Sequence, residues 1–134
     1  MGVLYEIRCS HCGYKKNLSL GQGMMGHKLE KVLPFFSTEL QERIKKALQD
    51  MSDEHFWVAE RKLGWCQDCG VYEAVPTFKI VYGERELCFE EKCVCGLNFN
   101  MLTMDETELA NEIAKHACPN CKGSLEGKIV GNWD

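Results

Sequence analysis

Apolar and polar residues alternate in several short stretches of the chain, and this period of two predicts β-strands. The first two stretches, Tyr5–Arg8 and Tyr14–Leu20, are close enough in sequence to form a hairpin. Phe56–Leu63 and Asn98–Leu102 show a similar pattern later in the chain. We therefore expect short antiparallel hairpins.

The longest alternating stretch, residues 73–91, predicts a hairpin that joins the two halves of the chain. Phe78, Ile80 and Tyr82 fall on one face of this hairpin. After the turn, Cys88 falls on the face opposite to its apolar neighbours. We therefore expect the Cys88 side chain to be exposed.

Helical periodicity appears in the remaining stretches. Thr38 and Gln41 form a predicted capping box that would begin a helix. Its inward face would carry four apolar residues: Leu40, Ile44, Leu48 and Met51. Glu106–His116 predicts a second helix, and His27–Leu33 predicts a short helical turn that Pro34 ends.

Together these elements predict an α+β fold built from small antiparallel hairpins. We expect two units, an N-terminal one over residues 1–77 and a C-terminal one over residues 78–134. The first would carry a helical insertion at about residues 24–51, and the second would contain one helix. The final segment, residues 124–134, would close the second unit.

Nine cysteines are many for a chain of 134 residues, and their spacing indicates their role. Eight fall in four close pairs: Cys9/Cys12, Cys66/Cys69, Cys93/Cys95 and Cys118/Cys121. Gly13, Gly70 and Gly96 directly follow three of these pairs, and Gly123 follows the last pair after one residue. A glycine there relieves a backbone whose φ tends to be positive.

Each close pair can direct two sulfurs at one point, so two pairs can hold one tetrahedral Zn²⁺. The eight paired cysteines therefore predict two structural four-cysteine zinc sites, with Cys88 left over as a non-ligand. His11 and His116 lie close to cysteine pairs but are not needed as ligands. The alternative of a redox dithiol at Cys66/Cys69 is disfavoured because no helix is predicted to begin there.

The sequence leaves open which pairs share a metal. Sequential pairing would join Cys9/Cys12 with Cys66/Cys69, and Cys93/Cys95 with Cys118/Cys121. Nested and alternating arrangements cost only slightly more loop-closure entropy, because that cost grows as the logarithm of loop length. We expect sequential pairing, because each half would then contain a complete pair of knuckles around a helix.

Charge and composition predict a cytoplasmic protein that does not enter a membrane. The formal net charge is −4, and no apolar run approaches the length of a membrane span. Charge and a cysteine follow soon after the N-terminus, which does not fit an export signal. In the reducing cytosol, paired cysteines favour metal sites over disulfides.

The phrases "CSHCGY" and "CQDCGV" resemble the knuckles of rubredoxins and zinc ribbons. The phrase "CGYKKNLSLGQGMM" is similar to small bacterial zinc-ribbon proteins without an assigned function. These resemblances imply zinc-ribbon folds around structural zinc. The rubredoxin likeness implies iron and electron transfer as an alternative, although Gln67 stands where rubredoxins usually have proline.

The tandem arrangement also resembles the two-ribbon subunits and cleavage factors of RNA polymerase. In the cleavage factors a functional Asp-Glu pair lies between the cysteine pairs, and Asp105–Glu106 holds a comparable place. The residues around it nevertheless indicate a helix start, with Thr103 and Glu106 as a capping box.

Gly21, Gly23 and Gly26 match the G-x-G-x-x-G of dinucleotide-binding turns. That turn works between a strand and a helix of a parallel βαβ unit, which this sequence does not predict. We expect these glycines to let the chain swing from the first hairpin into the helical insertion.

We predict that the protein is not an enzyme and has no small-molecule substrate, because a four-cysteine zinc site leaves no open coordination position. The predicted function is binding a protein partner. The predicted contact surface is the insertion Gly23–Met51, with four large apolar residues: Met24, Met25, Phe35 and Phe36. Nucleic-acid binding through the basic N-terminal stretch, with Lys15 and Lys16, is an alternative that the acidic net charge disfavours.

Overall fold

A computed structural model describes residues 2–21, 28–51, 54–102 and 105–133. The fold is mostly antiparallel sheet with three short α-helices, which confirms the predicted mixture of hairpins and helices. The elements along the chain are β1 (Gly2–Cys9), β2 (Lys15–Gly21), α1 (Leu29–Val32), the 3₁₀ helix η2 (Leu33–Phe35), α2 (Thr38–Asp50), β3 (Phe56–Cys66), β4 (Val71–Tyr82), β5 (Arg85–Glu90), β6 (Asn100–Met101), α3 (Glu106–Ala114) and β7 (Leu125–Trp133).

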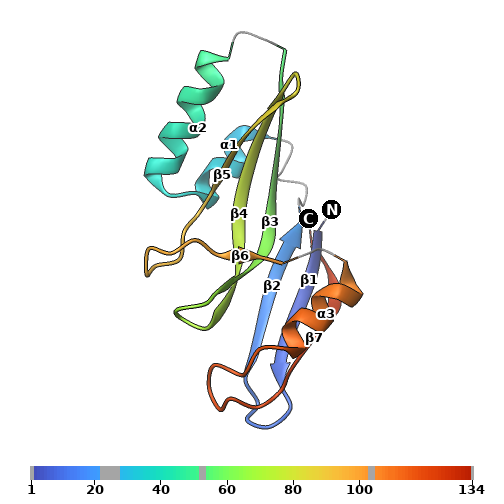
Figure 1. The fold of residues 1–134 in the computed structure, drawn as a ribbon. Helices are drawn as coiled ribbons and strands as arrows, with labels where there is room; N and C mark the ends of the chain where they lie inside the picture. The colour runs from blue at the N-terminus through green and yellow to red at the C-terminus, as the bar shows by residue number, and fades with distance from the viewer. Residues whose placement is uncertain (1, 22–27, 52–53, 103–104, 134) are drawn as a thin grey trace.

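The strands follow the order β5-β4-β3-β2-β1-β7, and the short β6 pairs with β3. Two well-paired portions are visible in Figure 1: an inner half-sheet of β5, β4 and β3, and an outer half-sheet of β2, β1 and β7. Backbone pairing between β2 and β3 is confined, in the described part of the chain, to Gly21 and Arg61. The two half-sheets are therefore joined at one point of the ladder.

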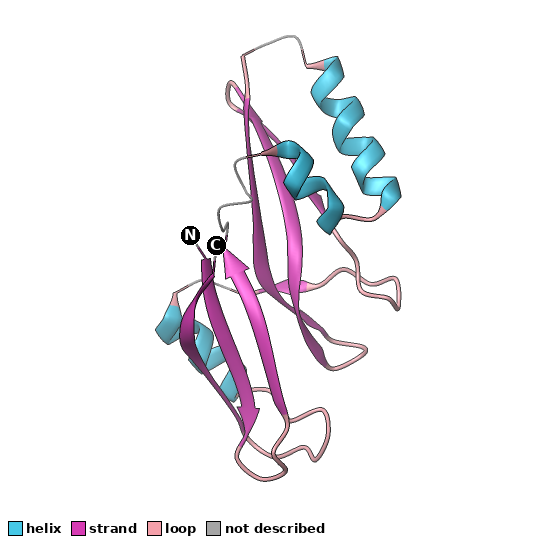
Figure 2. Cartoon of the chain, turned by 180° about the vertical axis from the view of Figure 1, so that it is seen from behind, coloured by secondary structure: helices cyan, strands magenta, loops and turns pink. Residues whose placement is uncertain are grey.

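The inner half-sheet is covered on one face by α1, η2 and α2 (Figure 2). The amphipathic face of α2 contributes Leu40 and Ile44 to the core there, beside Phe78 and Ile80 of β4. Phe78 and Ile80 are completely buried, as their shared face predicts. Burial of these side chains stabilises the half by removing apolar area from water.

The outer half-sheet packs against α3, which supplies Leu109 and Ile113 to a second core. That core includes Tyr5 and Ile7 of β1. It also includes residues of the inner half-sheet: Leu63 of β3 and Tyr72 of β4. The second core therefore holds the two half-sheets together where their ladder does not.

The helix caps differ from the predicted ones. Ser37, rather than Thr38, caps α2, and its hydroxyl accepts a hydrogen bond from the Leu40 amide at 3.3 Å. Asp105 caps α3 by accepting from the Glu108 amide at 3.0 Å. The predicted cap Thr103 lies outside the described residues. In both helices a neighbouring side chain with an equivalent oxygen takes the capping position.

The final strand is the largest departure from the prediction. β7 pairs antiparallel with β1 along its whole length, from Cys9 beside Leu125 to Gly2 beside Trp133. It therefore completes the first hairpin rather than the second unit. The predicted boundary between residues 77 and 78 falls inside β4. None of the helices in the described ranges is long and apolar enough to cross a lipid bilayer.

Candidate metal centres

The eight paired cysteines gather into two groups of four. We call them the outer cluster, made of Cys9, Cys12, Cys118 and Cys121, and the inner cluster, made of Cys66, Cys69, Cys93 and Cys95. Within each cluster all sulfur atoms lie within 4.8 Å of one another. Each cluster is therefore compact enough to hold one metal ion.

The outer cluster forms where the β1–β2 turn meets the loop between α3 and β7. Cys9 Sγ lies 3.4 Å from Cys121 Sγ, and Cys12 Sγ lies 3.6 Å from Cys118 Sγ. Four sulfurs at about 2.3 Å from a tetrahedral ion are about 3.8 Å apart. The sulfurs therefore already stand near the spacing that such an ion imposes. Cys9 and Cys118 are buried, whereas Cys12 and Cys121 are exposed.

The inner cluster forms between the β3–β4 turn and the loop that follows β5. Cys66 Sγ lies 3.6 Å from Cys95 Sγ, and Cys69 Sγ lies 3.7 Å from Cys93 Sγ. Here too each knuckle offers one buried and one exposed cysteine. The two clusters thus have matching donor sets, and both fit the four-sulfur sites of zinc ribbons.

The expected sequential pairing is wrong, because the arrangement is nested. Cys9/Cys12 meets Cys118/Cys121, and Cys66/Cys69 meets Cys93/Cys95. The physical reason is the pairing of β7 with β1, which places Cys9 directly beside Leu125 and so brings the last knuckle next to the first. The free energy of sheet pairing and core burial outweighs the small difference in loop-closure entropy.

Backbone amides point at several of the sulfurs. In the outer cluster the amide of His11 donates to Cys9 Sγ at 3.3 Å, and that of Asn120 donates to Cys118 Sγ at 3.4 Å. In the inner cluster the Cys69 amide donates to Cys66 Sγ at 3.5 Å. Such donors stabilise thiolates, which are the form that binds a metal.

Backbone hydrogen bonds lower the pKa values of some thiols, whereas hydrogen bonds between thiols raise those of others. A hydrogen bond with the Tyr14 backbone lowers the pKa of the Cys12 thiol to about 6. In the same way, a hydrogen bond with the Cys69 backbone lowers the pKa of the Cys66 thiol to about 7. By contrast, hydrogen bonds from Cys93 and Cys95 raise the pKa of Cys69 to about 12. In the inner cluster, some sulfurs therefore favour the thiolate while others hold the shared protons, which a bound cation would displace.

Three knuckles use glycine in the predicted way. Gly13, Gly70 and Gly96 have φ values of 79°, 68° and 91°, in the region that side chains disfavour. In the fourth knuckle the left-handed residue is Lys122, with φ 63°, and not Gly123. Gly123 is needed for close approach instead, because a Cβ atom there would lie 2.5 Å from the His11 ring.

An aromatic group that sequence reasoning missed connects the clusters. Trp65, which precedes Cys66, stacks on His116, which lies two residues before Cys118. The Tyr72 hydroxyl makes a short hydrogen bond to His116 Nδ1. Neither His11 nor His116 belongs to either of the two groups, each of which consists of four cysteines. Of this aromatic group, only Trp65 is marked in the sequence, because it directly precedes a cysteine pair.

The remaining candidates lie away from both clusters. Cys88 is exposed on β5, as its position in the hairpin predicts. Gly21 ends β2, which is antiparallel to both neighbours, whereas a dinucleotide turn follows a parallel strand. Gly23 and Gly26 lie outside the described residues, as do Met24 and Met25.

Comparison with protein-family models, with curated proteins and with solved structures finds no significant match to this chain. The function is therefore inferred from the geometry of the two clusters.

Proposed function

We propose that this protein binds two zinc ions, one in each four-cysteine cluster, and that both ions are structural. The observation that carries the proposal is the convergence of eight cysteines into two sets whose paired sulfurs are 3.4 to 3.7 Å apart. Four thiolates complete the tetrahedral coordination of zinc and leave no position for a substrate. Cysteines that bind zinc must stay reduced, which suits a reducing compartment, so we place the protein in the cytoplasm.

The proposed ions stabilise segments that have little other support. The knuckle loops are exposed at their tips, with Val94 fully accessible and Leu97 about half accessible. Cross-linking two such loops through a metal supplies free energy that apolar burial does not provide there. We therefore expect removal of the metal to loosen both knuckle regions.

Metal analysis tests the proposal. The full chain is purified without added metal, and its zinc, iron and visible absorption are measured together. Two zinc ions per chain and no colour are the expected result. The C88S variant is the matched control, and it should retain both ions because Cys88 lies outside both clusters. Retention of zinc in a variant that lacks Cys66 and Cys118 would contradict the proposal.

Iron in place of zinc is the second candidate, because the amide donors to sulfur suit a four-thiolate iron site as well. Hydrogen bonds to cysteine sulfurs tune the reduction potential of iron–sulfur sites. The amides of His11, Cys69 and Asn120 occupy such positions. Iron with thiolate charge-transfer bands in the same measurement would make the protein an electron carrier rather than a zinc protein.

Beyond metal binding, we propose that the protein binds a protein partner through the helical insertion. Support comes from Phe35, which is 36% exposed at the end of η2, while Phe36 is buried in the core. The F35S variant should lose the partner and keep both metals. F56S is the matched control, since Phe56 is 59% exposed on β3 outside the insertion. Equal partner binding by F35S and the wild type would contradict this role.

Lys15 and Lys16, the residues considered for nucleic-acid binding, and Arg8 of the same stretch each pair with a carboxylate. Arg8 pairs with Glu126 at 3.7 Å, Lys15 with Glu6 at 3.4 Å, and Lys16 with Glu73 at 2.8 Å. These carboxylates offset the positive charge that phosphates would need. The partner that we propose is therefore a protein.

A further inference from the structure

The sulfurs of the outer cluster are well supplied with N–H donors. Each of its four sulfurs accepts one hydrogen bond from such a group. The amide of His11 donates to Cys9 at 3.3 Å, that of Asn120 to Cys118 at 3.4 Å, that of Gly123 to Cys121 at 3.4 Å, and the side chain of Asn120 to Cys12 at 3.6 Å. A hydrogen bond to a thiolate stabilises its negative charge and so lowers its nucleophilicity.

The inner cluster has fewer donors of this kind. The Cys69 amide donates to Cys66 Sγ at 3.5 Å, and a hydrogen bond with the Leu97 backbone acts on Cys95. In the part of the chain that the structure describes, neither Cys69 nor Cys93 accepts a hydrogen bond from an N–H group. The sulfurs of these two residues are therefore the more nucleophilic ones once both are thiolates.

Exposure gives Cys69 and Cys93 different roles. Cys69 is exposed in the turn between β3 and β4, so a dissolved oxidant can reach its sulfur. Cys93 is only 6% exposed, yet its sulfur lies 3.7 Å from that of Cys69. A disulfide of about 2.05 Å requires the two sulfurs to approach by about 1.7 Å. This arrangement suits an accessible thiolate that is oxidised first and a sheltered neighbour that then attacks it.

We propose that the inner cluster is a redox site, in which hydrogen peroxide joins Cys69 to Cys93 in a disulfide and the cluster loses its zinc. The inference rests on the proposed zinc sites. The Cys69 thiolate attacks one peroxide oxygen, the O–O bond breaks, and a sulfenic acid forms as hydroxide leaves. The Cys93 thiolate then attacks the Cys69 sulfur and displaces a second hydroxide. Two electrons pass from the sulfurs to the peroxide, and two protons from solvent convert both hydroxides into water.

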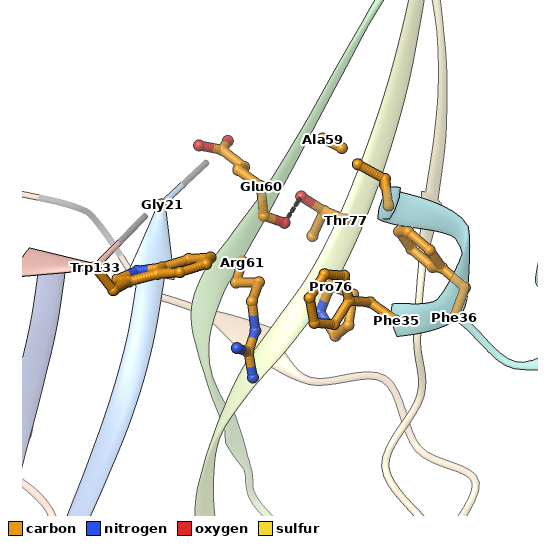
Figure 3. Close-up of a pocket in the computed structure, with 10 residues that line it drawn as sticks. Gly21, Phe35, Phe36, Ala59, Glu60, Arg61, Pro76, Thr77 and Trp133 are labelled. Carbon is orange, nitrogen blue, oxygen red and sulfur yellow. Dashed lines mark hydrogen bonds between the residues drawn. The ribbon is translucent and has the colours of Figure 1, made fainter. Parts of the chain in front are cut away.

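The disulfide removes two of the four ligands of the inner cluster only. Cys66 and Cys95 alone cannot complete a tetrahedral zinc site, whereas the outer cluster keeps its ligands beside the paired β1 and β7. The two half-sheets also stay joined by contacts without cysteine. At their junction, Figure 3 shows Arg61 between Trp133 and Phe35, with Cζ 5.9 Å and 5.4 Å from the respective ring centres. Both distances are within the range of cation–π attraction.

Oxidation of the zinc-loaded C88S chain tests the proposal, because this change removes the exposed ninth thiol. Zinc is measured before peroxide is added, and this step alone tests the proposed function. Released zinc is then followed with a coloured chelator, and disulfides are mapped by mass spectrometry after the free thiols are alkylated. We expect loss of one of two ions and a Cys69–Cys93 bond. Dithiothreitol with added zinc should restore the lost ion.

The N120A variant in the same background tests whether N–H donors protect the outer cluster. It removes the side-chain donor to Cys12. The outer cluster should then release zinc to excess peroxide roughly threefold faster, the effect of about one pKa unit on thiolate nucleophilicity. N98A is the matched control, because Asn98 is exposed in the loop of the inner cluster and its side chain donates to no sulfur among the described residues.

Three results with the C88S chain would overturn the proposal: release of both ions at one rate, earlier release from the outer cluster, or a disulfide other than Cys69–Cys93. Equal zinc release from the outer clusters of N120A and N98A would overturn it as well, because the hydrogen bonds would then not set the order. All four results leave the proposed zinc sites standing, since zinc is measured before oxidation. A chain without zinc at that first step would overturn both proposals.

Discussion

Trp65 stacks on His116, with ring centroids 4.2 Å apart and planes inclined by 18°. Trp65 lies in β3 of the inner half-sheet, whereas His116 follows α3, which packs on the outer half-sheet. Each of the two residues lies close to a knuckle of a different cluster. The stack therefore connects the two proposed metal sites, which share no ligand. The hydrogen bond between Tyr72 and His116 strengthens the same connection. We infer that the stabilities of the two clusters are coupled.

The W65A variant tests this coupling. Loss of a half-buried aromatic stack should lower the free energy of unfolding by about 2–3 kcal/mol. It should also speed zinc release from the outer cluster, although Trp65 is next to the inner one. Urea unfolding measures the first effect. Zinc release to a chelator in a C69S background, where the outer site alone keeps a complete ligand set, measures the second.

W57A is the matched control, because Trp57 stacks on Phe78 at 5.1 Å in the core away from both clusters. It should destabilise the fold with a smaller effect on outer-cluster zinc release. If W65A leaves zinc release from the outer cluster at the wild-type rate, the two sites are independent.

Double cysteine variants test the nested arrangement directly. The C12S/C121S variant removes two ligands of the outer cluster and should lose one zinc ion while keeping the other. The C12S/C69S variant damages both clusters and should lose both ions. Sequential pairing predicts the reverse, since Cys12 and Cys69 would then share one site. Zinc content per chain after gel filtration separates the two arrangements.

The K122G variant should stabilise the outer cluster. Lys122 has φ 63°, a conformation in which a side chain is strained and glycine is not. Its side chain is exposed, so little packing is lost. We expect a gain of about 0.5–1 kcal/mol in the free energy of unfolding, measured with urea in the zinc-loaded protein.

The reciprocal change is the control for this effect. Gly13 has φ 79° and has no atom within 4 Å of a Cβ added to it, so G13K introduces backbone strain without a clash. It should lower the free energy of unfolding by about 1 kcal/mol. A loss of stability in K122G would show that the lysine side chain has a role which outweighs the strain.

The Y5F variant should be at least as stable as the wild type at neutral pH. Tyr5 is 1% exposed, and its hydroxyl oxygen has no hydrogen-bond partner among the residues described. Removing a buried polar atom that lacks a partner avoids its desolvation cost, so a gain of about 1 kcal/mol is expected. Urea unfolding at pH 7 measures it, and a clear loss of stability would reveal a partner for the hydroxyl.

The same residue predicts a dependence on alkaline pH. Burial, with a smaller effect of the Glu106 charge, raises the pKa of Tyr5 to about 12. An unfolded tyrosine ionises near pH 10, so between about pH 10 and 12 the unfolded chain releases a proton that the folded chain keeps. Stability therefore falls as pH rises through this window. The fall should be smaller in Y5F, by up to about 1.4 kcal/mol per pH unit.

Much of the local structure could be predicted from the sequence because short-range pattern controls it. The burial of Phe78 and Ile80 and the exposure of Cys88 follow from alternation along one hairpin. The positive φ at Gly13, Gly70 and Gly96 follows from the geometry of a knuckle. The capping residues were placed less well, because Ser37 and Thr38 offer the same hydroxyl chemistry at adjacent positions.

For the candidate metal centres, too, one part followed from the sequence and another part only from the tertiary structure. The sequence by itself determined which eight cysteines form close pairs, because two sulfurs only two or three residues apart meet through local turns. The tertiary structure alone decided which pairs share a cluster, since Cys9 and Cys121 are 112 residues apart. It also decided the Trp65–His116 stack and the position of Arg61 between Phe35 and Trp133. The reason is that β7 pairs with β1. Burial of both strands against α3 stabilises this pairing, which no pattern within either strand predicts.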